Sequence, residues 1–223
     1  MSVLLPAVVL AAGGVVLLGG DSSAGRDGTL DMARMMKILP RGKEVPGYRA
    51  EFAYPDLTLG PNPDLLCGDM SVALLSHERA PEASTLVVLT ETGRTQERYE
   101  AESYSYAPDV AVTVMEEMRA ALPGCAAYNA EYADLSYGFG LKEVPPAYPV
   151  GDEALAYRVL EPPFRMVSSS QIVDLPTDLA DTGRTVTFVR TGGVITQYKS
   201  LPPRRVFEAF EGRFRRASDA ARY

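Results

Sequence analysis

The stretch RTVTFVRTGGVITQYK (184–199) decides the fold class, because its pattern is that of a β-hairpin. In the first arm, Val186 and Phe188 alternate with threonines, which is typical of a strand with one buried face. Gly192 and Gly193 then form a two-residue turn signal, because hairpin turns of this length need positive φ angles. The sequence therefore predicts two antiparallel strands joined by a tight turn.

Three segments outside this hairpin also have the pattern of strands. STLVVLTET (84–92) is a short apolar run with β-branched residues, and EALAYRVL (153–160) alternates larger apolar residues with polar or small ones. RYEAESYSY (98–106) mixes polar and aromatic residues, which predicts a half-exposed strand. GFG (138–140) is predicted to be a turn.

Three segments predict helices. The clearest begins at Pro108 and Asp109 and ends at the breaker sequence 122–124. A short one is predicted within LDMARMMKIL (30–39), and a third, near the end of the chain, carries phenylalanines spaced three and four residues apart. The alternation of helices and hairpins predicts an α+β domain, with a mostly antiparallel sheet and helices packed on it.

The N-terminal residues predict a signal peptide or a membrane anchor. Residues 2–20 carry no charged side chain, and a helix needs about 20 apolar residues to cross a bilayer. Two interpretations stay open, a secretory signal cut after Ala24 and a retained anchor. The predicted organisation is a signal peptide or membrane anchor over 1–20, a linker and short helix over 21–45, and a single extracytoplasmic domain over 46–223.

The chain has two cysteines, Cys67 and Cys125, and no C-x-x-C motif. In an exported protein this favours one disulfide between them, and two buried free thiols are the alternative. The formal net charge of −7 argues against nucleic acid as a partner, because a nucleic-acid site needs a basic surface.

Motifs for catalysis, metal binding and cofactor binding are not found in the sequence. It has a single histidine, His77, and no G-x-S-x-G, H-E-x-x-H, P-loop or G-x-G-x-x-G pattern. We therefore expect no enzyme activity, no metal and no cofactor. A glycosidase with a pair of carboxylates stays open, because such pairs have no local spacing rule.

Two features are candidates for binding. Tyr99, Tyr104 and Tyr106 offer flat apolar faces with hydroxyl groups, as in a ligand groove, or they are ordinary cross-strand tyrosines. From Arg204 to Tyr223 the chain carries six arginines against three acidic residues. This basic helix either faces anionic lipid headgroups or presents a solvated polar face opposite its phenylalanines.

Four segments together resemble the PknH-like extracytoplasmic sensor domain of actinobacteria. They are the Cys67 segment followed by STLVVLTET, the helix APDVAVTVMEEMRAALPGC (107–125), GDEALAYRV (151–159), and VTFVRTGGVITQY (186–198) before a C-terminal helix. The resemblance covers roughly residues 60 to 220 and rests on the order of these segments.

The resemblance implies an α+β ectodomain with a cleft that binds a ligand or envelope component and performs no catalysis. That family commonly has two disulfides, whereas this chain can form only one. We therefore expect an exported, membrane-associated sensor or ligand-binding domain of the bacterial cell envelope, whose partner is a small molecule, a lipid or an envelope component. A carrier of lipid or other apolar ligands, or an envelope scaffold, is the second interpretation, and an uncharacterised hydrolase is the third.

Overall fold

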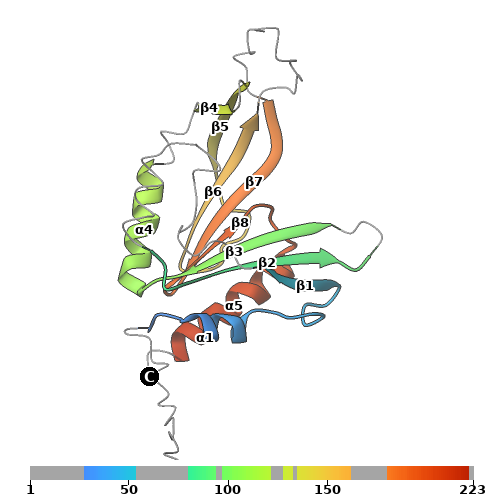
Figure 1. Cartoon of the computed structure of the whole chain (residues 1–223), viewed down its shortest axis with the longest axis vertical. Helices are drawn as coiled ribbons and strands as arrows, with labels where there is room; N and C mark the ends of the chain where they lie inside the picture. The colour runs from blue at the N-terminus through green and yellow to red at the C-terminus, as the bar shows by residue number, and fades with distance from the viewer. Residues whose placement is uncertain are drawn as a thin grey trace, which may run out of the picture.

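A computed structural model describes residues 28–53, 80–93, 97–121, 128–132, 135–161 and 180–220. Within these ranges the chain forms an α+β domain, as predicted (Figure 1). The helices are α1 (Met32–Ile38), α4 (Pro108–Ala121) and α5 (Arg204–Ala220). The strands are β1 (Tyr48–Ala53), β2 (Ala83–Glu91), β3 (Arg98–Ser105), β4 (Tyr128–Tyr132), β5 (Leu135–Val144), β6 (Glu153–Glu161), β7 (Ala180–Thr191) and β8 (Val194–Tyr198). The predicted signal or anchor, His77 and the predicted Cys67–Cys125 disulfide lie outside the described residues.

The strands form one sheet in the order β1-β2-β3-β8-β7-β6-β5-β4, and every pair is antiparallel. The predicted hairpin is confirmed as β7 and β8, which lie in the middle of the sheet. β8 pairs on its other side with β3, about 100 residues earlier in the chain, through contacts such as Ala101 with Tyr198. The hairpin therefore joins the two halves of the sheet.

One local prediction is wrong. GFG (138–140) lies inside β5, with Gly140 opposite Leu160 of β6 and Phe139 opposite Tyr128 of β4. Glycine is unfavourable in a strand because it loses backbone entropy and packs no side chain. Pairing on both sides of β5 overrides that local preference.

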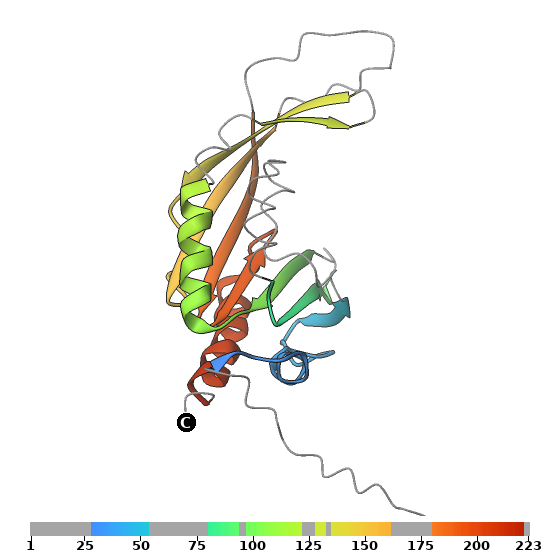
Figure 2. The ribbon, with the colours of Figure 1, turned by 60° about the vertical axis from the view of Figure 1, so that its left-hand side comes forward.

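Each face of the sheet carries its own core. Side chains alternate between the faces along every strand, so α1 and α5 pack on one face while α4 packs on the other. Figure 2 shows α4 alongside the long strands β6 and β7, with α1 and α5 grouped away from it. We call these the α5 face and the α4 face.

The phenylalanine stripe of α5 forms the centre of the larger core. Phe207, Phe210 and Phe214 are each at most 2% exposed, and the ring of Tyr198 on β8 lies 4.6 Å from that of Phe207. Fully burying a phenylalanine contributes about 1.5–3 kcal/mol relative to leaving it exposed. The stripe therefore holds α5 on the central hairpin.

The larger core also includes residues from the segment predicted as linker and short helix. Leu30, Met35 and Leu39 are buried there. Asp31 caps α1, because its carboxylate accepts a hydrogen bond of 2.8 Å from the backbone N–H of Arg34. The described residues from 28 onward thus share a core with the sheet. None of the described helices is long and apolar enough to span a membrane.

Candidate functional site

The three tyrosines predicted to bind a ligand do not lie together. Tyr99 lies on the α5 face, where its ring centroid is 6.0 Å from that of Tyr48. Tyr104 and Tyr106 lie in the core of the α4 face, and each is 2% exposed. Alternation along the strand separates Tyr99 from the other two. The tyrosines therefore form no common binding surface.

The α4 face carries a row of polar side chains next to Tyr104. They come from three neighbouring strands, β2, β3 and β8, and from the residue directly after β8. We call them the polar lane: Ser84, Glu100, Glu102, Gln197 and Lys199. In the register of the sheet, Gln197 lies opposite Glu102, and Ser84 lies opposite Tyr104.

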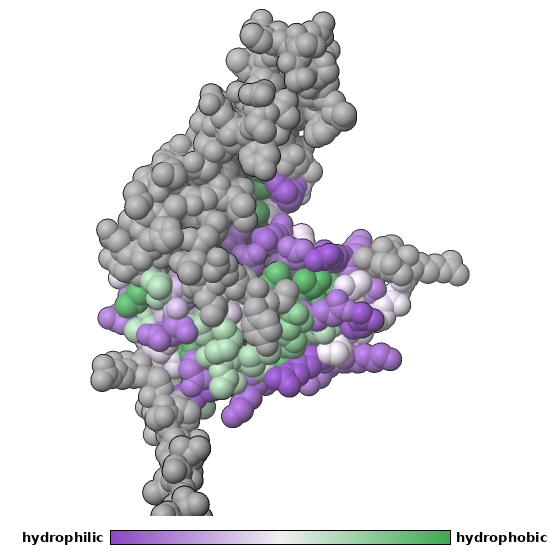
Figure 3. Space-filling model, in the orientation of Figure 1, coloured by the Kyte–Doolittle hydropathy of each residue, from purple (hydrophilic) through white to green (hydrophobic). Residues whose placement is uncertain are grey.

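Charged groups meet at the centre of the polar lane. The ammonium nitrogen of Lys199 lies 2.6 Å from Oε1 of Glu102 and 3.6 Å from Oε2 of Glu100. The hydroxyl of Tyr104 donates a hydrogen bond of 2.7 Å to Oε2 of Glu102. A hydrophilic band lies over β3 in the space-filling view (Figure 3). Arg98 of β3 also pairs with Oε1 of Glu100, at 3.0 Å, so the two carboxylates of the lane face two cations and the formal charges balance.

The polar lane is open at one end and closed at the other. The side chains of Lys199 and Glu100 are 35% and 28% exposed, whereas that of Glu102 is 10% exposed. Gln197 and Ser84 are 1% and 0% exposed as whole residues. Solvent therefore reaches the Lys199 end, and exposure falls steadily toward the buried residues.

The closed end contains polar atoms that lack a partner. Oε1 of Gln197, Oγ of Ser84 and the hydroxyl of Tyr106 are buried and make no hydrogen bond to any residue that the structure describes. Leaving a buried polar group unpaired costs about 1–3 kcal/mol. Such atoms in a native fold call for an explanation, and here they lie on the face that carries the charged pair.

Burial and nearby charges shift the pKa values of Lys199 and Tyr104. Burial alone lowers the pKa of Lys199, but its hydrogen bond to Glu102 and the charges of Glu102 and Glu100 outweigh that effect and leave the pKa raised. Burial, together with the charge of Glu102, raises the pKa of the Tyr104 hydroxyl. At neutral pH Lys199 is therefore charged and the Tyr104 phenol is neutral.

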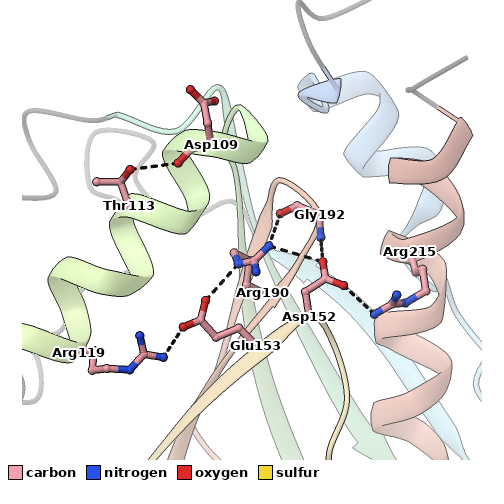
Figure 4. A network of polar contacts seen from close by, with 8 residues as sticks. All are labelled: Asp109, Thr113, Arg119, Asp152, Glu153, Arg190, Gly192 and Arg215. Atoms are coloured by element: carbon pink, nitrogen blue, oxygen red, sulfur yellow. Dashed lines mark hydrogen bonds and ion pairs between the residues drawn. The ribbon is translucent and has the colours of Figure 1, made fainter.

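A second polar cluster lies where α4 and α5 approach the β7–β8 turn (Figure 4). It consists of Arg119, Asp152, Glu153, Arg190 and Arg215. At its centre, Nε of Arg190 lies 3.2 Å from Glu153 and its Nη1 lies 3.6 Å from Asp152. Asp152 also accepts a hydrogen bond of 2.7 Å from the backbone N–H of Gly192.

The two ends of this cluster reach the two helices. Arg119 of α4 pairs with Glu153, and Arg215 of α5 lies 3.1 Å from Asp152. The cluster brings together residues from three of the segments that carried the family resemblance, namely α4, 151–159 and 186–198. Because the charged groups of the cluster pair with one another, we interpret the cluster as a structural link between α4 on one face of the sheet and α5 on the other.

Replacing Arg190 by methionine should lower the free energy of unfolding by about 2 kcal/mol, because two partly buried carboxylates lose their shared cation. Arg49→Met is the matched control. Its ion pair with Glu51 is exposed, so its loss should cost less than about 0.5 kcal/mol. Urea unfolding of the two variants measures both values, and equal costs would contradict the structural role of the cluster.

The basic residues of α5 also pair within the protein. Arg204 lies 2.7 Å from Glu208, and Arg213 lies 3.1 Å from Glu44 and donates to the backbone carbonyl of Ile38 at 3.2 Å. With Arg215 held by Asp152, these contacts favour the interpretation of a solvated polar face over that of a lipid-headgroup surface.

A buried carboxyl lies under α5. Glu211 is 1% exposed and accepts hydrogen bonds from the hydroxyls of Tyr198 at 2.5 Å and Thr191 at 2.7 Å. Burial raises the pKa of Glu211 to about 7, although these hydrogen bonds lower it in part. The group is sealed inside the α5-face core, so we treat it as a determinant of stability and not as a binding group.

Among the residues that the structure describes, no group of three or more histidine, cysteine or acidic side chains is placed to hold a metal ion. Compared with known proteins, the chain matches no family model, no curated protein and no solved structure. The PknH-like resemblance therefore stays a prediction.

Sequence reasoning selected Tyr104 but missed the polar lane around it. The signal was present in RYEAESYSY (98–106), where Glu100 and Glu102 share the period-two face of Tyr104. The partners Gln197 and Lys199 come from β8, and only the pairing of β3 with β8 brings them beside those residues.

Proposed function

We propose that this chain is a non-enzymatic ligand-binding or sensor domain of the bacterial cell envelope, exported by segment 1–20 as either a cleaved signal or a retained membrane anchor. In this proposal the polar lane is the ligand site. The lane lies on paired strands in the middle of the sheet, so its side chains are held on a rigid support.

One observation carries this proposal. Gln197 is 1% exposed and lies on the same face of the sheet as the Lys199–Glu102 pair. Its Oε1 atom has no hydrogen-bond partner among the described residues. Because an unpaired buried acceptor destabilises the fold, a ligand that donates a hydrogen bond to it would recover that cost. The side chains of Lys199 and Glu100 are partly exposed, so this end of the lane lies at the surface.

The chemistry of the lane also bears on the second interpretation. A carrier of lipid or another apolar ligand needs a long apolar cavity. Charged and amide groups instead favour a polar ligand, since burying them against a hydrocarbon chain would leave them without partners. We therefore prefer a polar ligand to a lipid tail.

Native mass spectrometry of the protein purified from its own envelope tests this function. We expect the wild type to retain a small polar molecule that Glu102→Gln does not retain. Glu51→Gln is the control, because Glu51 is an exposed glutamate on β1 whose partner is Arg49. An empty wild type, as expected if the lane holds only water, would overturn the proposal, and so would equal retention by Glu102→Gln.

The same sample tests whether segment 1–20 is cleaved and whether Cys67 and Cys125 form a disulfide. Denaturing mass spectrometry should give the mass of a chain that either begins after Ala24 or keeps its first 20 residues. Reduction should add two hydrogens if Cys67 and Cys125 are bridged. Free thiols in the unreduced sample would contradict the predicted disulfide and weaken the family resemblance.

A further inference from the structure

The polar lane already holds an organic ammonium group, that of Lys199. Glu100 and Glu102 are two residues apart on β3, so their side chains leave the same face of the strand. Both carboxylates lie within 4 Å of the one ammonium nitrogen, at 3.6 and 2.6 Å. The two carboxylates together therefore hold one primary ammonium group, with Arg98 on the other oxygen of Glu100 at 3.0 Å.

Lys199 is attached at the open end of the lane. It follows the last residue of β8, its side chain is 35% exposed, and its backbone N–H is held by the carbonyl of Glu100 at 3.2 Å. The lysine side chain is flexible and can keep its ammonium group in water. Glu102 is only 10% exposed, so its carboxylate would be left without a cation if the Lys199 head moved out alone, and the head leaves only when another cation takes its place.

The unpaired atoms of the lane indicate which hydrogen-bonding groups a ligand needs in addition to its ammonium group. Oε1 of Gln197 accepts hydrogen bonds only, and Oγ of Ser84 can accept as well as donate. Both lie deeper than the carboxylates, at 1% and 0% exposure. A ligand that reaches them past Glu102 therefore needs an N–H or O–H group beyond its ammonium.

We propose that the polar lane binds an organic amine whose ammonium group replaces the Lys199 head between Glu100 and Glu102, and whose second donor reaches Gln197. Lys199 then acts as a built-in competitor that leaves when the ligand enters. This inference rests on the proposed function and names the chemical class of its ligand.

Calorimetric titration of the full chain with 1,4-diaminobutane tests the inference, with 1,4-butanediol as the uncharged analogue of the same length. Lys199→Met should bind the diamine about tenfold more tightly than the wild type, because the internal competitor is gone. Glu102→Gln in the Lys199→Met background should lose at least about tenfold. The diol should bind to none of these proteins.

Lys142→Met is the matched control. Lys142 is an exposed lysine on β5, four positions from β3 in the strand order, so this variant changes the net charge equally without touching the lane. Equal diamine affinity of the wild type and Lys199→Met would overturn the inference, and so would an equal gain in Lys142→Met or binding of the diol. If the diamine fails but native spectra show a retained neutral or anionic molecule that Glu102→Gln loses, the ligand class is wrong and the proposed function stands.

Discussion

Gly193→Ala should lower the free energy of unfolding by about 3 kcal/mol, near the upper end of the cost of overpacking. A Cβ atom at Gly193 would lie 2.3 Å from the backbone carbonyl oxygen of Tyr106, a distance that real Cβ atoms do not show. The two segments are also joined by a hydrogen bond of 2.8 Å from the Tyr106 N–H to the Gly193 carbonyl. To relieve this clash, the β7–β8 turn would have to move away from the segment that leads into α4.

Urea unfolding measures this effect, and Gly93→Ala is its control. A Cβ at Gly93 would meet only the flexible side chain of Glu91, at 3.6 Å, so this change should stay within about 0.5 kcal/mol. If Gly193→Ala were as stable as Gly93→Ala, the close approach of the turn to Tyr106 would be refuted.

Glu211 should make the protein less stable as the pH rises from about 5 to 7. The pKa of this buried carboxyl is about 7 in the folded protein, against an ordinary value of 4.5. Between these two values the folded state binds more protons than the unfolded state, so the free energy of unfolding falls with rising pH. Above pH 7 the contribution is constant, and the shift corresponds to about 3 kcal/mol.

Glu211→Gln should remove this dependence. At pH 8 the variant should be more stable than the wild type by up to about 3 kcal/mol, whereas at pH 5 the two should be close. The amide keeps the shape of the side chain, and the hydroxyls of Tyr198 and Thr191 can either donate or accept. Urea unfolding at both pH values measures the difference.

Glu208→Gln serves as the control for this pH effect. Glu208 lies on the same helix but is exposed and paired with Arg204, so its variant should follow the wild type at both pH values within about 0.5 kcal/mol. A Glu211→Gln protein that is less stable than the wild type at pH 8 would show that the ionised carboxyl stabilises the fold.

The elements with strong local signals were predictable. The glycine pair at 192–193 predicted the central hairpin, and the phenylalanine spacing of α5 predicted a helix with one buried face. β1 and β5 were missed because YRAEFA (48–53) has no clear alternation and GFG (138–140) carries glycines. Their strand conformation depends on neighbours that are distant in the sequence, Leu89 for β1 and Val159 for β5 among them.

The candidate site shows the same division. Tyr104 was predicted to bind a ligand through its aromatic ring. In the structure that ring is packed in the core of the α4 face, and the hydroxyl donates a hydrogen bond to Glu102. Gln197 and Lys199 had no local signal of their own. They join Glu102 only because β8 pairs with β3, and no residue spacing encodes that pairing.

The claim that a ligand occupies the polar lane can be tested at a single side chain. The chain has three glutamines, Gln96, Gln171 and Gln197, so labelling glutamine with nitrogen-15 gives the side-chain amide signals of three residues. The signal that disappears in the Gln197→Asn variant is that of Gln197. In Lys199→Met, saturating 1,4-diaminobutane should shift the Gln197 signal and leave the other two in place. A Gln197 signal that does not move at saturation would contradict the account.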